Sequence, residues 1–517
     1  MVPISGLYRR LALFVLVVML VPLAGVAAPI HAQDGPALGF EAWDCPFPAL
    51  DGVTCGYLTV PEDRSQPDGY TIDLAVAIIS PWDSDPDPVP VIYLEGGPGG
   101  SPLLSTDVFQ AEPIAENHTL ILFDQRGTGF SLPSLNCPEL EGDQGGSDDP
   151  VQACRDRLEA EGIDLQMYNS AANAADVYDL VMALGYDQVN LWGISYGTKL
   201  GLTILRDTPE IVQSAVLDSV YAPEVDDLSP QSGFMGALYT LFESCAADSA
   251  CSDLYPDLEG DFYTMLNQLD AAPVTLDLDG EELTLDGAAV YNALFTTLYD
   301  TQAIPFLPYG IELLAYPQGE DDYAAGYSIL SDADFPIAVS TGPQIDAPIE
   351  ESDQVQAYID EAGQIDDSEG MAFSVDCQEE YQLDSPDAAL SAAEAAPVPL
   401  NAYFLDGINS TLQDCATWGV QDADPIETQR VISDVPTLLF AGGFDPITPA
   451  SSAESALQGL SNGQLLVFPS AGHGVTFAAT DAGACAKSLM IAFLDDPYAP
   501  LDTRCIAETS AIDFYTD

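Results

Sequence analysis

The sequence predicts an α/β fold in which a mostly parallel sheet is flanked by helices and interrupted by an inserted, mainly helical segment. Three observations lead to this prediction. Strand-like apolar runs alternate with helical patterns in the N-terminal part, the alternation is lost in the middle, and it resumes towards the C-terminus. With 517 residues, of which 47% are hydrophobic, the chain is long enough to bury a large core.

The expected strands are short apolar runs, and the later ones are continuously apolar rather than alternating. This pattern is typical of strands buried on both faces of a parallel sheet. The predicted strands cover residues 53–60, 70–80, 90–95, 118–124, 188–193, 214–220, 436–443 and 463–470.

Helical patterns lie between these runs. In "ANAADVYDLVMALG" the residues Val177, Leu180, Val181 and Leu184 share one helical face, and Gly185 is a natural stop.

The middle of the chain contains the helical stretches "FMGALYTLF" and "DFYTMLNQL" and a hairpin pattern around Asp279 and Gly280. We therefore divide the chain into a core of residues 33–225 and 426–517 and an inserted cap of residues 226–425.

The N-terminus resembles a secretory signal. Arg9 and Arg10 precede a long apolar run that ends in small residues, so we expect residues 1–32 to be removed and the protein to be secreted or held at the exterior of the cell envelope. An uncleaved membrane anchor is the alternative. No stable membrane association is expected after cleavage.

Ten cysteines, an even number in an exported chain, favour disulfides over metal ligands or redox thiols. We expect the pairs to be sequential neighbours. These are Cys45 with Cys55, Cys137 with Cys154, Cys245 with Cys251, Cys377 with Cys415, and Cys485 with Cys505.

The chain carries 83 acidic and 11 basic residues, a net charge of −72. Such a surface repels nucleic acids and anionic membranes, which excludes both as expected partners. Solubility in a salty medium explains the charge, and attraction of cationic ligands such as a free peptide amino terminus is a second reading.

The stretch GISYG at residues 193–197 follows a strand-like run and precedes a helical one. A Gly-x-Ser-x-Gly in this context is typical of a nucleophile elbow, a turn so sharp that little besides glycine fits beside the serine. Ser195 is therefore the candidate nucleophile, and a small residue in an ordinary tight turn is the alternative.

A nucleophilic serine needs a base, and the chain has three histidines. His31 lies in the N-terminal segment, and His118 opens a strand ahead of the serine. His473 lies in "PSAGHGV", on a glycine-flanked loop after a late strand, and is the candidate base.

The orienting acid is expected at another strand end. Asp445 follows the apolar run of "TLLFAGGFDPITPA", whereas Asp434 and Asp481 are competing acids. The order Ser195, Asp445, His473 is the one that α/β-hydrolases use.

The oxyanion needs two backbone donors. Tyr196, the residue after the serine, supplies one, and the loop "VIYLEGGPGGSP" supplies the other through Gly97 or, alternatively, Gly96. This chemistry needs no metal and no organic cofactor.

Two segments resemble a known family. "EGGPGG" resembles the His-Gly-Gly-Pro-Gly loop, and "FDQRGTGFS" the Asp-Gln-Arg-Gly-x-Gly-x-Ser signature, of prolyl-aminopeptidase-like serine exopeptidases. The paired cysteines, "AGGFDPITP" and "AGHG" are most similar to the secreted bacterial tripeptidyl-aminopeptidase branch, from about Trp43 to Cys505. The resemblance implies an α/β-hydrolase core, a helical cap and the triad proposed above.

The resemblance also assigns roles to several charged residues. Glu95 stands where the family usually has histidine, so we expect it to modify geometry, specificity or turnover. Glu379, with Glu380 as second choice, lies in "VDCQEE" and is a candidate ligand of a substrate ammonium group. Asp124 and Arg126 are interpreted as structural.

The sequence therefore predicts a secreted serine hydrolase that removes short peptides or single residues from peptide amino termini through an acyl-enzyme. Small peptides are the expected partners, and the sequence leaves the oligomeric state open. Alternatives are a carboxylesterase on the same scaffold, a prolyl aminopeptidase, and a non-catalytic binding protein with a hydrolase fold.

Overall fold

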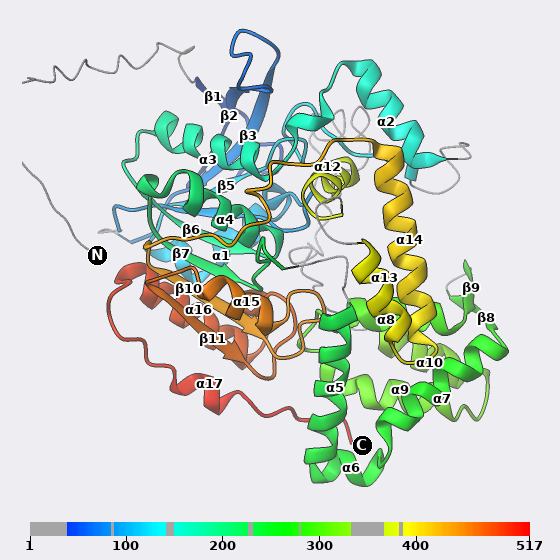
Figure 1. Cartoon of the computed structure of the whole chain (residues 1–517). Helices are drawn as coiled ribbons and strands as arrows, with labels where there is room; N and C mark the ends of the chain where they lie inside the picture. The colour runs from blue at the N-terminus through cyan, green and yellow to red at the C-terminus, as the bar shows by residue number, and fades with distance from the viewer. Residues whose placement is uncertain are drawn as a thin grey trace, which may run out of the picture. The chain divides into compact units, whose positions relative to one another are not determined.

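The large sheet of the protein has nine strands, in the order β1-β2-β3-β5-β4-β6-β7-β10-β11 (Figure 1). The computed structural model describes residues 39–83, 87–140, 149–225, 231–278, 281–331, 367–381 and 386–516. The predicted signal segment 1–32 lies outside these residues. The strands of the large sheet are β1 Phe40–Trp43, β2 Val53–Pro61, β3 Thr71–Ile79, β4 Val91–Leu94, β5 Leu120–Phe123, β6 Val189–Ile194, β7 Val212–Asp218, β10 Thr437–Gly442 and β11 Gly463–Phe468.

The sheet is antiparallel at its N-terminal edge and parallel elsewhere. β1, β2, β3 and β5 pair antiparallel, whereas β5, β4, β6, β7, β10 and β11 form a parallel run. The predicted strands are all present, and only β1 was not expected. In a parallel sheet the carboxyl ends of the strands meet at one edge, which is where such folds place their sites.

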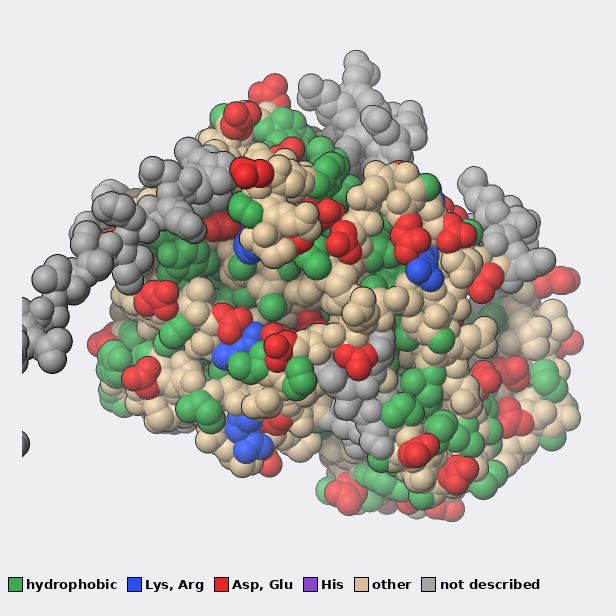
Figure 2. All heavy atoms as spheres, turned by 45° about the horizontal axis from the view of Figure 1, so that its top comes forward, with side chains coloured by type: hydrophobic (Ala, Val, Ile, Leu, Met, Phe, Trp, Pro, Cys, Tyr) green, Lys and Arg blue, Asp and Glu red, His purple; other side chains and the backbone are tan. Residues whose placement is uncertain are grey.

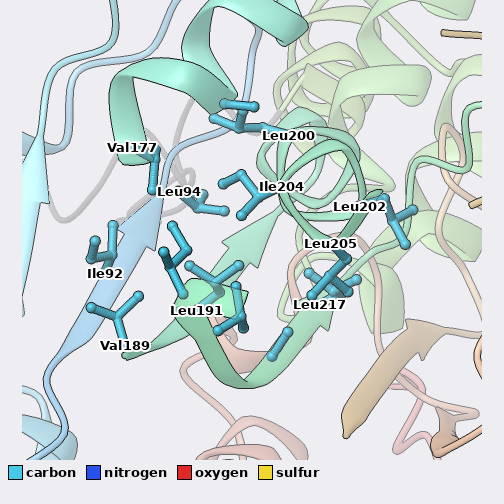
Figure 3. Packing of buried hydrophobic residues seen from close by; sticks show 14 of the residues in the cluster. Ile92, Leu94, Val177, Val189, Leu191, Leu200, Leu202, Ile204, Leu205 and Leu217 are labelled. Atoms are coloured by element: carbon cyan, nitrogen blue, oxygen red, sulfur yellow. The ribbon is translucent and has the colours of Figure 1, made fainter. Parts of the chain in front are cut away.

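Helices cover both faces of this sheet. One hydrophobic cluster joins the sheet to α3 Ser170–Leu184, α4 Tyr196–Asp207 and α15 Ala450–Leu457. A second cluster joins the opposite face to α1 Thr106–Ala111 and α16 Asp481–Asp495. The expected helix stop is confirmed, because Gly185 caps α3 with a φ of 78°. Figure 3 shows Val177 of α3 and Leu200 of α4 near the aliphatic side chains of the central strands.

The described chain between β7 and β10 is mainly helical and contains one hairpin. Its helices pack around their own hydrophobic cluster, which includes Phe234, Phe262 and Leu294. The predicted hairpin is formed by β8 Val274–Leu278 and β9 Glu281–Leu285, while Asp279 and Gly280 lie outside the described residues. The boundaries at 226 and 425 remain predictions. The remaining helices are α2 Pro150–Glu161, α5 Gln231–Ala247, α6 Ser249–Leu254, α7 Leu258–Ala271, α8 Gly287–Thr297, α9 Leu307–Ala315, α10 Glu320–Ser331, α12 Glu369–Glu379, α13 Pro386–Ala395, α14 Leu400–Trp418 and α17 Arg504–Glu508.

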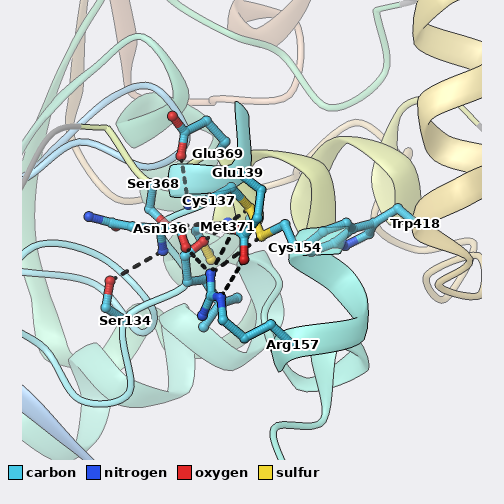
Figure 4. The surroundings of a disulfide bond; sticks show 12 residues. Ser134, Asn136, Cys137, Glu139, Cys154, Arg157, Ser368, Glu369, Met371 and Trp418 are labelled. Atoms are coloured by element: carbon cyan, nitrogen blue, oxygen red, sulfur yellow. Dashed lines mark hydrogen bonds and ion pairs between the residues drawn. A yellow bond between two sulfur atoms is a disulfide. The ribbon is translucent and has the colours of Figure 1, made fainter. Parts of the chain in front are cut away.

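All five expected sequential cysteine pairs are bonded. The Cys377–Cys415 bond joins α12 to α14. Figure 4 shows the surroundings of Cys137–Cys154, where Arg157 of α2 pairs with Glu139 and where the Cys137 N–H donates to Glu369 at 3.0 Å. The hydrogen bond to Glu369 connects the start of α12 to a loop of the core.

Acidic side chains are scattered over the face drawn in Figure 2, whereas basic side chains on it are few. Each Lys and Arg of the described chain takes part in an ion pair. Within the described ranges, no helix combines the length and the hydropathy that a membrane span requires.

The central strand β6 offers a test of the core. Leu191 is fully buried, so Leu191→Ala should lower the free energy of unfolding by about 2–5 kcal/mol through lost burial and a residual cavity. Met182→Ala, at a side chain of α3 that is 39% exposed, is the control and should change little. Guanidinium unfolding measures both, and equal midpoints for the two variants would contradict this packing.

Candidate active site

Ser195 lies at a sharp turn between β6 and α4. Its backbone has φ 52° and ψ −126°, a conformation that a residue with a side chain rarely adopts. The Ser195 N–H donates to the carbonyl of Asp218 at 3.0 Å, which ties the turn to the end of β7. The local structure is the strand–turn–helix that the GISYG motif predicts.

The two glycines of the motif are required by close packing. A Cβ at Gly193 would lie 2.6 Å from the carbonyl oxygen of Gly197. A Cβ at Gly197 would collide with the backbone of Leu94 and lie 2.9 Å from the carbonyl oxygen of Glu95. Side chains at these positions would force the turn and β4 apart, so glycine keeps Ser195 next to the loop that follows β4.

Asp445 and His473 are directly paired. The Asp445 Oδ2 and His473 Nδ1 atoms are 2.9 Å apart, and both residues are buried. Burial alone would raise the pKa of Asp445, but His473 and the hydrogen bonds from Thr448 outweigh it, so this pKa lies below its usual value. Asp445 is therefore ionised and orients the imidazole.

The loop that carries His473 also contacts the residue beside the serine. A Cβ at Gly474, which has φ 69°, would lie 2.8 Å from the Cδ1 atom of Ile194. Ser195, Asp445 and His473 follow β6, β10 and β11 respectively, all at the carboxyl edge of the parallel strands. The structure brings the loops of all three candidate residues to one edge of the sheet.

Residues that sequence reasoning missed hold the His473 loop in place. Asp218, at the end of β7, accepts hydrogen bonds from the N–H groups of Val475 at 3.1 Å and Thr476 at 2.7 Å. Ser219 Oγ accepts one from the Gly474 N–H at 2.8 Å. The only signal in the sequence was an acid near the end of a strand-like run, and the many other acids of this chain obscure it.

Tyr299 of the inserted segment was also missed. Its carbonyl accepts a hydrogen bond from the His473 N–H at 3.0 Å, and its ring centroid lies 4.7 Å from that of the imidazole. The insertion therefore contributes directly to the surroundings of the candidate base. Local sequence patterns carry no sign of this contact, because it joins residues far apart in the chain.

The loop after β4 distinguishes the two oxyanion candidates. The Gly96 N–H donates to Oε1 of Glu95 at 2.8 Å, which leaves Gly97 as the better candidate donor. A Cβ at Gly96 would lie 3.0 Å from the Cβ of Ser195, so this loop lies against the candidate nucleophile. Tyr196 begins α4 immediately after Ser195.

Glu95 lies in this loop with an altered acidity. Burial raises its pKa to about 7, and the charge of Asp367 contributes to the rise. The Tyr93 hydroxyl donates to its Oε1 atom at 3.3 Å. The residue that replaces the family's usual histidine therefore changes charge near neutral pH.

A cavity of about 590 Å³ opens beside Gly96, Gly97 and Ile194. One part of its wall is apolar and includes Leu104, Phe109 and Phe477. Its carboxylates are Glu95, Asp367, Glu369 and Asp376.

Glu379 and Glu380, the candidate ligands of a substrate ammonium group, do not belong to this wall. Their binding of such a group stays a prediction. Both are buried and form ion pairs with Lys199 of α4. Glu379 and Glu380 lie beyond Asp376, near the C-terminal end of α12, where they turn into the protein interior. Glu379 shares α12 with Glu369 and Asp376, which do line the cavity.

Asp124 and Arg126 have the structural roles expected of them. Asp124 accepts hydrogen bonds from Ser101 Oγ and the Phe130 N–H. Buried Arg126 pairs with Asp176 at 2.8 Å.

Two groups of potential metal ligands occur in the described chain, Cys137 with Glu139 and Cys154, and Asp87 with His118 and Asp495. Cys137 and Cys154 form a disulfide, and His118 Nε2 lies 3.1 Å from Asp495 Oδ1. We assign no metal to either group.

Comparisons with known proteins agree with this geometry. Residues 89–309 match a family model described as alpha/beta hydrolase fold, and residues 401–505 match one described as TAP-like protein. Serine protease Hip1 of Mycobacterium tuberculosis is 24% identical over 486 residues, which are 86% of this chain and 85% of that protein. Tripeptidyl aminopeptidase of Streptomyces lividans is 32% identical over 207 residues, 36% of this chain and 38% of that protein.

Among solved structures, proline iminopeptidase of Mycobacterium smegmatis is 15% identical, with a TM-score of 0.35 over 85% of this chain and 97% of that one. The matches of the two family models span both sides of the inserted helices. The chain therefore belongs to the α/β-hydrolases, as a serine hydrolase with a TAP-like C-terminal region.

Proposed function

We propose that the protein is a secreted exopeptidase that releases short peptides or single residues from peptide amino termini. The observation that carries the proposal is the buried Asp445–His473 pair at the same sheet edge as the strained turn of Ser195. A paired acid and imidazole at the same sheet edge as a half-buried turn serine are the parts of an acyl-transfer site.

In the proposed mechanism Ser195 attacks the substrate carbonyl while His473 accepts its proton. Asp445 holds the imidazole and stabilises its charged form. The N–H groups of Tyr196 and Gly97 donate to the oxyanion. His473 then protonates the leaving amine, and water releases the acyl group from Ser195.

The cavity supports recognition of a substrate ammonium group. Glu369 and Asp376 lie on the cavity side of α12, and Asp367 lies two residues before the first residue of this helix. Carboxylates in a partly buried wall favour a cationic group, whereas the apolar side accommodates neighbouring side chains. These residues take the role first expected for Glu379 and Glu380.

Secretion is supported by the five disulfides, which persist in oxidising compartments. The exopeptidase assignment is supported by the relatives named tripeptidyl aminopeptidase and proline iminopeptidase.

Replacing the nucleophile tests the reaction class. Ser195→Ala should abolish labelling by a fluorophosphonate probe and lower kcat for a tripeptidyl chromogenic substrate at least about 10⁴-fold, with an unchanged circular dichroism spectrum. Ser105→Ala, in the cavity wall, is a matched serine control and should still be labelled. Full hydrolysis by Ser195→Ala would refute the mechanism.

Blocking the amino terminus tests the exopeptidase assignment. A free-amino tripeptidyl substrate should have a kcat/KM at least about tenfold above that of its acetylated form, because the cavity carboxylates bind the cation. Asp376→Asn should reduce this ratio, whereas Asp387→Asn, at an exposed side chain of α13 outside the cavity wall, should leave it unchanged. Equal values for both substrates in the wild type would instead favour an endopeptidase or esterase.

The raised pKa of Glu95 predicts that kcat/KM depends on pH for a substrate that lacks an amino group. Because its pKa is raised to about 7, Glu95 is neutral below this pH and anionic above it, and the anion opposes the forming oxyanion. The substrate is the p-nitrophenyl ester of an amino acid whose amino group is acetylated. Its kcat/KM should fall on the order of tenfold as the pH rises through the pKa of Glu95. Glu95→Gln should remove the fall, and an identical alkaline limb in that variant would contradict the prediction.

A further inference from the structure

A buried cluster of charges lies beside the candidate nucleophile, outside the proposed mechanism. Lys199 is four residues after Ser195 on α4 and is fully buried. Its Nζ lies 3.1 Å from Oε2 of Glu379 and also contacts Glu380. It lies 5.1 Å from the ring centroid of Tyr221. Two carboxylates at the end of α12 are thus joined to the helix that begins at the nucleophile.

Glu379 extends this cluster to the residue that donates to the oxyanion. It accepts hydrogen bonds from the Ser170 N–H at 2.6 Å and from Ser170 Oγ at 2.8 Å. The hydroxyls of Ser170 and Tyr196 are 3.0 Å apart. Burial raises the pKa of Tyr196, with Glu379 adding to the rise, so the phenol stays protonated and remains in this hydrogen-bonded chain.

The same chain continues to the second half of the oxyanion hole. The Asn173 Nδ2 donates to the Tyr196 hydroxyl at 3.4 Å and to Gln125 Oε1 at 3.1 Å. The Gln125 Nε2 then donates to the carbonyl of Glu95 at 3.0 Å. That carbonyl lies one residue before Gly96 and two before Gly97. Tyr196 and the loop after β4 are therefore connected through side chains that all reach back to Glu379.

We propose that Lys199 and Glu379 are positioning residues that couple the docking of α12 to the alignment of both oxyanion donors. The inference rests on the proposed function. The helix that carries the cavity residues Glu369 and Asp376 would thereby be linked to the groups that stabilise the transition state. A cap helix displaced from α4 would leave Lys199 buried without its partners, which is costly, and would release Tyr196 and the loop together.

The side chains of this network are also buried, which such coupling requires. Each polar link is buried, since Ser170, Asn173, Tyr196, Lys199 and Glu379 are all fully inaccessible. A buried network of this kind is held in one arrangement because every unmade bond costs the desolvation of its partners. Its effect on catalysis should therefore exceed that of an exposed ion pair of the same composition.

The test compares Glu→Gln variants of two glutamates, each of which pairs with a basic residue of α4. Glu379→Gln removes the charge opposite Lys199. Glu427→Gln removes the charge opposite Arg206, which also lies on α4 but away from the cavity. Glu379→Gln should lower kcat at least about tenfold with KM changed less than twofold, since misaligned donors affect the transition state. Glu427→Gln should leave both constants near the wild-type values.

A transition-state analogue separates positioning from general destabilisation. The inhibition constant of a peptidyl trifluoromethyl ketone, which forms a tetrahedral adduct with the nucleophile, should rise in Glu379→Gln by the same factor as kcat/KM falls. Glu379→Asp, which keeps the charge, should recover part of the activity. An unchanged inhibition constant alongside a lowered kcat would overturn the proposal.

Tyr196→Phe provides a second route that leaves the buried charges in place. It removes the hydroxyl but keeps the backbone N–H, and it should lower kcat by a factor similar to that of Glu379→Gln. The double variant should lose no more than either single variant, because both interrupt one chain. Additive losses would refute the coupling, whereas hydrolysis that survives in Ser195→Ala would instead refute the proposed function.

Discussion

The site depends on the close approach of three backbone segments around Ser195. The positive φ of this residue turns the chain so abruptly that Gly193 and Gly197 contact each other, and Gly197 contacts the end of β4. This contact places the loop of Gly96 against the serine. Because the turn is strained, it persists only where neighbouring strands and α4 hold it on both sides.

Much of the fold and the candidate site could be predicted because their signals are local. Continuous apolar runs indicate the parallel strands. The glycines of GISYG indicate a sharp turn between a strand and a helix. His473 could be selected because histidines are scarce in this chain. Asp445 could be selected among many acids because it directly follows an apolar run, and in the structure it pairs with that histidine.

The parts that could not be predicted depend on which way a side chain faces. Glu379 and Asp376 are three residues apart on α12, yet one pairs with Lys199 and the other lines the cavity. The short stretch "VDCQEE" has no periodic apolar face that would assign these directions. Likewise, Tyr299 reaches His473 through a contact between the insertion and the core, which no pattern within either segment encodes.

Basic residues are scarce in this chain, and the few that are buried pair with buried carboxylates. In a chain with 11 basic and 83 acidic residues, most carboxylates are tolerated because water solvates them at the surface. A buried carboxylate lacks that solvation and needs a cation or several donors. Arg126 and Lys199 are both fully buried, and they pair with Asp176 and with Glu379 and Glu380 respectively. The net charge of this protein therefore reflects its surface. The positions of its few buried basic residues show where buried carboxylates need a positive charge.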